Sequence, residues 1–184
     1  IHMNSYLFSN MNYINDNNYN DMEQIINEQV SNGKFYITIY LSRQIVDFSI
    51  FNKITDLYFC NYYYPLTNLP ENLKKLELVF DKKKYEHKLD NLPPQLKLLS
   101  IEVRGNLEFD ILLDHLPQGL EILQVSTTTR YVHEFTDLPN SLRLFMCANS
   151  TTDNYEDNYG SNGVDSSIKV VFDLPEQEPK QEAP

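Results

Sequence analysis

The chain of 184 residues is poor in several residue types, and each shortage argues against a class of protein. It has only 2 cysteines, Cys60 and Cys147, which is too few for a disulfide framework, so we expect two free thiols in a reducing compartment. With 5 glycines and no Gly-rich phosphate-binding motif, it offers little material for a nucleotide-binding loop. No apolar run approaches the roughly 18 residues that cross a bilayer.

Basic residues are also scarce, since 15 Lys and Arg stand against 26 Asp and Glu, for a formal net charge of −11. An acidic surface repels phosphate backbones and anionic lipids, so we expect neither nucleic acid nor a membrane as a partner. The N-terminus lacks a signal-peptide profile, and residues 1–3 are typical of a cloning remnant that ends in an initiator Met. We therefore expect an intracellular protein. The Asn-rich residues 10–20 are given no functional weight.

The most informative feature is an internal repeat that begins with a Leu-Pro pair. Its leading leucines, at positions 69, 92, 116 and 138, are 23, 24 and 22 residues apart. The first three copies read LPxxLxxLx followed by an apolar residue, and the fourth has Phe145 in place of the third leucine. An apolar residue lies three positions before each leading leucine, and an aromatic residue lies seven positions before it. Weaker copies start at Ile50 and Val171, and a polar insertion over 149–167 precedes the last one.

The spacing within each unit predicts a short strand followed by an extended return. The LxL alternation is typical of a half-buried strand, whereas the proline fixes φ and cannot lie in the middle of a sheet. One unit cannot bury its leucines alone, so neighbouring units must stack in parallel. We therefore predict an α+β, mainly β fold, in which residues 46–172 form a solenoid with a parallel sheet of short strands on one face.

The flanking segments predict a cap and a tail. Residues 1–45 contain a helical pattern with Met22, Ile25, Ile26 and Val30 on one side, an N-terminal capping box at 20–23 and Gly33 as its end. A strand-like alternation over 35–41 follows, so this segment is predicted to be a small N-terminal cap. Residues 173–184 are predicted to be an acidic disordered tail.

The LPxxLxxLxL pattern resembles the leucine-rich repeat family, and it is most similar to the short proline-containing FNIP-type repeats of amoebae and their large DNA viruses. The resemblance covers residues 50–171, although the regular asparagine after the strand is missing, with Asp81, Arg104 and Thr127 at the matching positions. It implies a protein-recognition scaffold that is not an enzyme, needs no cofactor, and lies in the host cytoplasm or in a virion.

Candidate chemical groups are few. His87 and His133 occupy equivalent positions two units apart, which separates them by about 10 Å and argues against a shared metal ion. The acidic residues of the insertion do not follow the spacing of an EF-hand loop. Neither cysteine lies in a known thiol-enzyme motif, so we expect no catalytic residue and no metal site.

The side chains that alternate with the core leucines point away from the core and form the candidate protein-binding face. Four of these side chains are apolar and are predicted to form an exposed patch at Leu98, Ile122, Leu144 and Met146. Three alternatives stay open: the face binds an unidentified protein partner, it mediates self-association in a structural or virion protein, or another part of the chain covers it. The complete predicted face is Tyr58, Glu77, Leu98, Ser100, Ile122, Gln124, Leu144 and Met146.

Overall fold

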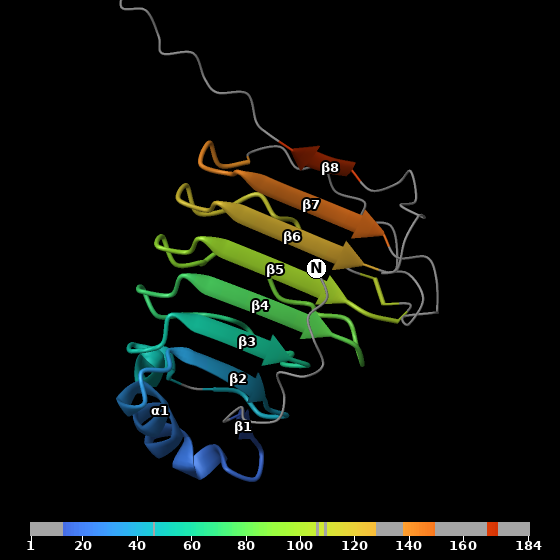
Figure 1. Ribbon diagram of the computed structural model, residues 1–184. Coiled ribbons are helices and arrows are strands. Elements are labelled where there is room, and N and C mark those ends of the chain that lie inside the picture. Colours follow the sequence, from blue (N-terminus) through green and yellow to red (C-terminus); the bar gives the residue numbers. More distant parts are fainter. Residues whose placement is uncertain are drawn as a thin grey trace, which may run out of the picture.

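The computed structural model describes residues 13–45, 47–105, 107–108, 110–127, 138–149 and 169–172. Within these ranges, eight strands form one sheet whose spatial order is the order of the chain. From the first strand to the seventh, neighbouring strands pair in parallel, and Figure 1 shows them stacked like the steps of a ladder. The strands are β1 (Tyr13–Asn15), β2 (Tyr36–Tyr40), β3 (Asp56–Cys60), β4 (Lys75–Phe80), β5 (Leu98–Val103), β6 (Ile122–Thr127), β7 (Leu144–Asn149) and β8 (Lys169–Phe172).

The Leu-Pro pairs form the turns that lead into β4 to β7. After each pair, the backbone N–H of the next leucine in the motif donates to the proline carbonyl, as in Leu73 to Pro70 at 3.1 Å and Leu96 to Pro93 at 3.0 Å. The following N–H groups then donate to the preceding unit, as in Lys97 to Lys74 at 2.8 Å. The proline fixes φ where no N–H is needed, and the next strand enters the ladder. The predicted parallel sheet of short strands is confirmed.

Leucines of successive units occupy the same register positions and form the core. Leu76 lies opposite Leu99, and Leu99 lies opposite Leu123, in the paired strands. All three side chains are completely buried. Burying one such side chain contributes about 1.5–3 kcal/mol relative to leaving it in water, and no single unit could bury it alone. Aromatic residues continue this packing, with the rings of Phe80 and Tyr85 stacked at a centroid distance of 4.8 Å.

The helical elements lie next to the first strands. The helix α1 (Met22–Ser31) follows a 3-10 turn, η2 (Tyr19–Asp21), and packs near η3 (Phe48–Phe51), at the β1–β2 end of the sheet in Figure 1. Met22 and Ile26 are buried, and Gly33 ends the helical segment with φ +70°. The predicted capping box is wrong, because Asp21 is the N-cap residue and its side chain makes no cap hydrogen bond. The 3-10 turn instead runs directly into the helix.

One further expectation is corrected at the C-terminal end of the sheet. The residues from Val171 were predicted to start another parallel unit, but β8 pairs antiparallel with β7, with Phe145 opposite Val171. An antiparallel strand hydrogen-bonds to the last strand without the return segment that a parallel unit needs. At the other end, the predicted helix and strand are present as α1 and β2, and β1 and β2 continue the sheet of the repeats.

The predicted polar insertion begins with Asn149, which is the last residue of β7. Its remaining residues, 150–167, lie outside the described residues, as does the predicted tail over 173–184. In the part of the chain that the structure describes, no helix combines the length and the apolar character needed to cross a membrane.

Candidate recognition face on the sheet

The sheet has a core face, which carries the buried leucines, and an opposite face, here called the outer face. The parallel register aligns the outer side chains in rows across the strands. The first row is Asp56, Lys75, Leu98, Ile122 and Leu144, and the second row is Thr38, Tyr58, Glu77, Ser100, Gln124 and Met146. The predicted site residues therefore lie on one face, as the alternation indicated.

The apolar side chains gather over β5 to β7. Leu98 lies opposite Ile122, and Ile122 lies opposite Leu144, so the three form a continuous row. Met146 belongs to the neighbouring row, where its Sδ lies 3.6 Å from the Nε2 of Gln124. All of these side chains are half-buried, whereas the patch was predicted to be exposed.

Three members of the predicted face are buried, which corrects the expectation that its side chains are accessible. Tyr58, Glu77 and Ser100 are only 8%, 6% and 9% exposed. Tyr58 packs with Cys60 and Val79 in a small apolar cluster that is separate from the leucine core. The sequence pattern distinguished the two faces, but it carried no information on how closely side chains pack across neighbouring strands.

Ion pairs hold the charged side chains of the outer face. The Nζ of Lys75 lies 2.6 Å from the Oε1 of Glu77, and Arg104 donates two hydrogen bonds to Glu102 at 2.8 and 3.1 Å. Burial alone would lower the pKa of Lys75. The hydrogen bond to Glu77 and the negative charge of its carboxylate have the larger combined effect, so the net shift of the Lys75 pKa is upward. Pairing allows Glu77 to be buried, because an isolated carboxylate would strongly resist leaving water.

Tyrosines line the outer face at the β1–β3 end, a feature that the sequence analysis missed except for Tyr58. Tyr36 packs against the small apolar cluster, and the rings of Tyr13 and Tyr40 meet edge to face at 6.3 Å. Burial raises the pKa of Tyr40 to about 12 and also raises the pKa of Tyr58. The alternation over residues 36–40, with tyrosines at both ends, was the signal that could have revealed this aromatic region.

The thiol of Cys60 is a poor candidate for nucleophilic chemistry. Cys60 is buried and free, and burial raises the pKa of its thiol. Because the thiolate is the reactive form, a raised pKa lowers its population at neutral pH. Of the two histidines considered as metal ligands, His87 packs edge to face on the ring of Tyr85, while His133 lies outside the described residues.

A different group of side chains has the composition of a metal site. Asp90, Asp114 and His115 each offer one ligand atom, and these atoms lie within 4.8 Å of one another. This group was not predicted, since the histidines at equivalent repeat positions are His87 and His133. A signal was present, since Asp90 and Asp114 each lie two positions before the leading leucine of a unit.

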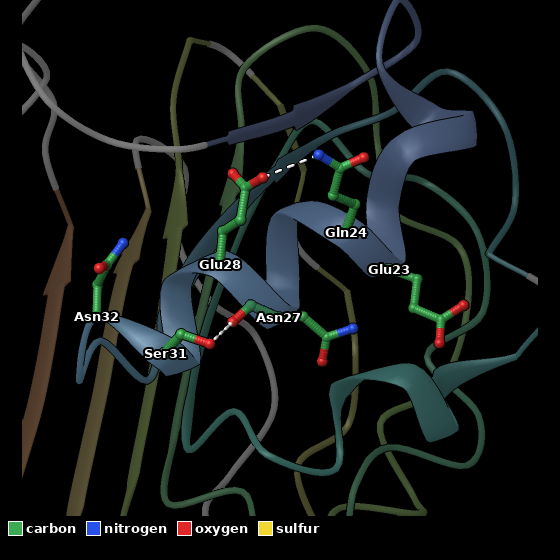
Figure 2. Close-up of a pocket in the computed structure, with 6 residues that line it drawn as sticks. All are labelled: Glu23, Gln24, Asn27, Glu28, Ser31 and Asn32. Carbon is green, nitrogen blue, oxygen red and sulfur yellow. Dashed lines mark hydrogen bonds between the residues drawn. The ribbon is translucent and has the colours of Figure 1, made fainter.

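A shallow depression on α1, of about 640 Å³, offers little for ligand binding. Figure 2 shows that the labelled side chains all come from this helix and from Asn32 directly after it. Gln24 donates to Glu28 at 2.9 Å, and Ser31 donates to the Asn27 carbonyl at 2.7 Å. No opposing wall lines it among the described residues. The lining residues are Glu23, Gln24, Asn27, Glu28, Ser31 and Asn32.

Comparisons of the chain with protein-family models, with curated proteins and with solved structures found no match. The outer face is therefore interpreted from its own residues.

Proposed function

We propose that this chain is a leucine-rich-repeat-type solenoid that recognises a partner protein through the outer face of its sheet and carries out no chemical reaction. The observation that carries the proposal is the aligned row of Leu98, Ile122 and Leu144, each half-buried on the face opposite the core. Side chains on the outer face of a sheet can be polar without cost to the core. An apolar residue at the same register position in three neighbouring strands therefore requires an explanation.

The repeat architecture supports the solenoid part of the proposal. Each unit from β4 to β7 has the same proline turn and hydrogen-bonds to its predecessor in the same way, so the units are structurally equivalent. Repeats of this kind present aligned side chains over an extended surface, which suits recognition of another chain. Variation at the outer positions can change specificity without altering the leucines.

The chemistry of the outer face supports recognition of a protein. The row beside the apolar row contains the polar residues Ser100 and Gln124, which is consistent with the apolar centre and polar rim of protein interfaces. Tyrosines at the β1–β3 end add aromatic surface of the kind enriched at interfaces. With the net charge of −11, this surface favours a partner that combines an apolar segment with basic residues.

An affinity capture from cell extract with paired variants tests the proposal. Ile122→Glu places a charge in the apolar row, whereas Gln118→Glu adds the same charge at an exposed turn position of the same unit. A protein that binds the wild type and Gln118→Glu should lose more than about 2 kcal/mol of binding free energy with Ile122→Glu, the threshold for an interface hot spot. Equal binding by both variants would place recognition elsewhere.

Self-association is the outcome that would replace an external partner. Light scattering over a range of concentrations measures it directly. A monomer at every concentration supports an external partner. An oligomer that dissociates with Ile122→Glu and persists with Gln118→Glu would instead identify a second copy of this chain as the occupant of the face.

A further inference from the structure

The turns that precede the Leu-Pro pairs carry a group of side chains away from the outer face. Asp90 and Asp114 occupy equivalent positions in successive units, and His115 directly follows Asp114. Leu89 and Leu113, the residues before the two aspartates, are both buried in the core. These buried leucines hold the backbone of Asp90 and Asp114 in place. The parallel pairing of β5 with β6 places the two turns beside each other.

The three side chains converge on one point. The Nδ1 of His115 lies 2.8 Å from the Oδ1 of Asp114 and 3.9 Å from the Oδ1 of Asp90. One ligand atom from each of the three residues lies within 4.8 Å of the other two. In tetrahedral coordination with bonds of about 2.0–2.2 Å, the ligand atoms are about 3.3–3.6 Å apart. The 3.9 Å distance is slightly longer than this value, whereas the 2.8 Å contact is a hydrogen bond that metal coordination would replace.

From this arrangement we propose that Asp90, Asp114 and His115 bind a divalent transition-metal ion such as Zn²⁺, with water in the remaining positions. Two carboxylate oxygens and an imidazole nitrogen form a mixed ligand set, which favours zinc and its neighbours over the hard ions Mg²⁺ and Ca²⁺. The ion would connect two successive units from the outside and would be independent of the proposed recognition face.

The charge balance of the group supports a bound cation. Two carboxylates held this close repel each other, and the basic side chain beside them is Lys88, whose Nζ lies 3.8 Å from the Oδ2 of Asp90. The Lys88 side chain is 84% exposed, so water and salt screen its charge. A divalent ion would neutralise both carboxylates at once.

A hydrogen bond is the competing explanation, since the Nδ1 of His115 lies within hydrogen-bonding distance of the Oδ1 of Asp114. In that case, the three residues would form a hydrogen-bonded surface cluster with no affinity for a metal ion. The two explanations differ in one measurable property, which is the response of the folded protein to added metal.

Calorimetric titration of the full chain with Zn²⁺ at neutral pH tests the proposal. We expect binding at one site that His115→Gln and Asp90→Asn each weaken by at least about tenfold, since removal of outer-shell partners alone already costs 10–100-fold. The matched control is His87→Gln, which removes another histidine and should bind like the wild type. Mg²⁺ should bind far more weakly. Saturating Zn²⁺ should raise the melting temperature of the wild type by several degrees and leave that of His115→Gln closer to its metal-free value.

Three results would overturn the proposal. Absence of Zn²⁺ binding would leave the hydrogen-bonded cluster as the explanation. Equal affinity of the wild type and His115→Gln would assign the zinc to other groups, such as the two thiols that both proteins share. An equal loss with His87→Gln would show that the affinity does not depend on this particular histidine.

Discussion

Leu98 lies directly opposite Ile122 in the parallel pairing of β5 with β6, while the next residues, Leu99 and Leu123, are opposite each other on the other face of the sheet. The outer pair is half-buried and the inner pair is fully buried. Two leucine-rich rows thus lie on either side of the same two strands. The inner row accounts for the stability of the fold, and the outer row needs a different explanation.

Substitution of Leu99 should have a large effect on stability, because its side chain is completely buried. Leu99→Ala should lower the free energy of unfolding by about 2–5 kcal/mol through lost burial and a residual cavity. Leu99→Asp should prevent folding, since it would bury an unpaired charge. Urea unfolding followed by circular dichroism measures both effects. Leu112→Ala is the control, because this leucine is exposed and should change stability by less than about 0.5 kcal/mol.

Replacement of the adjacent β6 residues Ile122 and Leu123 by glutamate should lower the stability of the fold to very different extents. Leu123→Glu should unfold the protein, whereas Ile122→Glu should cost only about 1 kcal/mol, roughly half the value of burying such a side chain completely. Thermal melts of the two variants, recorded beside the wild type, provide the comparison. If both variants unfolded, Ile122 would be shown to stabilise the fold as a core residue does. The outer row could then no longer be proposed as a binding surface.

Stability should fall at alkaline pH because of the buried tyrosines. Burial raises the pKa of Tyr58 and of Tyr85 in the folded state, whereas an unfolded tyrosine ionises near pH 10. The stabilisation is therefore fully present below about pH 10 and is lost as the pH rises further, because only the unfolded chain can release these protons easily. Tyr58→Phe keeps the ring and should make this decline shallower.

The measurement is the urea midpoint of the wild type and of Tyr58→Phe at several pH values from about 8 to about 11. The urea midpoint of the wild type should fall more steeply with rising pH than that of Tyr58→Phe, whatever their difference at neutral pH. Parallel curves over this range would show that Tyr58 does not contribute to alkaline unfolding.

The thiol of Cys60 should be protected until the chain unfolds. Its side chain is only 6% exposed, and burial raises the pKa of the thiol. In a Cys147→Ser variant, Cys60 is the one remaining thiol, and it should react with an aromatic disulfide reagent only when urea is added. Rapid reaction in native buffer, or a disulfide in the wild-type chain under non-reducing conditions, would contradict this expectation.

The strands of the repeats were predictable because one physical pattern recurs in each of them. A proline turn followed by alternating leucines specifies where a strand starts and which face is buried, as Leu76 and Leu99 illustrate. The first strand was not predictable in this way, since its Tyr13–Asn15 lie in an Asn-rich stretch that was given no weight. Ile14 is nevertheless completely buried there.

The asparagines of this stretch have a local structural role. The side chain of Asn18 accepts from the backbone N–H of Asn15 at 2.7 Å and donates to the carbonyl of Tyr13 at 2.9 Å. Such bonds form a turn after β1, which explains why a polar segment can lie next to the core. A composition argument could not reveal this, because it treats the residues as a group rather than by position.

The outer face and the group of Asp90, Asp114 and His115 could be predicted from the sequence to different extents. The apolar outer row followed from alternation, but the burial of Glu77 and Tyr58 depends on contacts between strands that are about 20 residues apart in the chain. The convergence of Asp90 with His115 depends on the distance between two turns, which the repeat period alone does not provide.

The antiparallel direction of β8 limits where further repeat units could be added to this architecture. Duplication of a unit within β4 to β7 would insert one more parallel strand and leave every hydrogen-bonding pattern intact, because the flanking units are equivalent. A unit added directly after β7 would instead have to displace an antiparallel strand that already pairs with it. Longer and shorter versions of this architecture should therefore differ by internal units, with the antiparallel strand retained at the end.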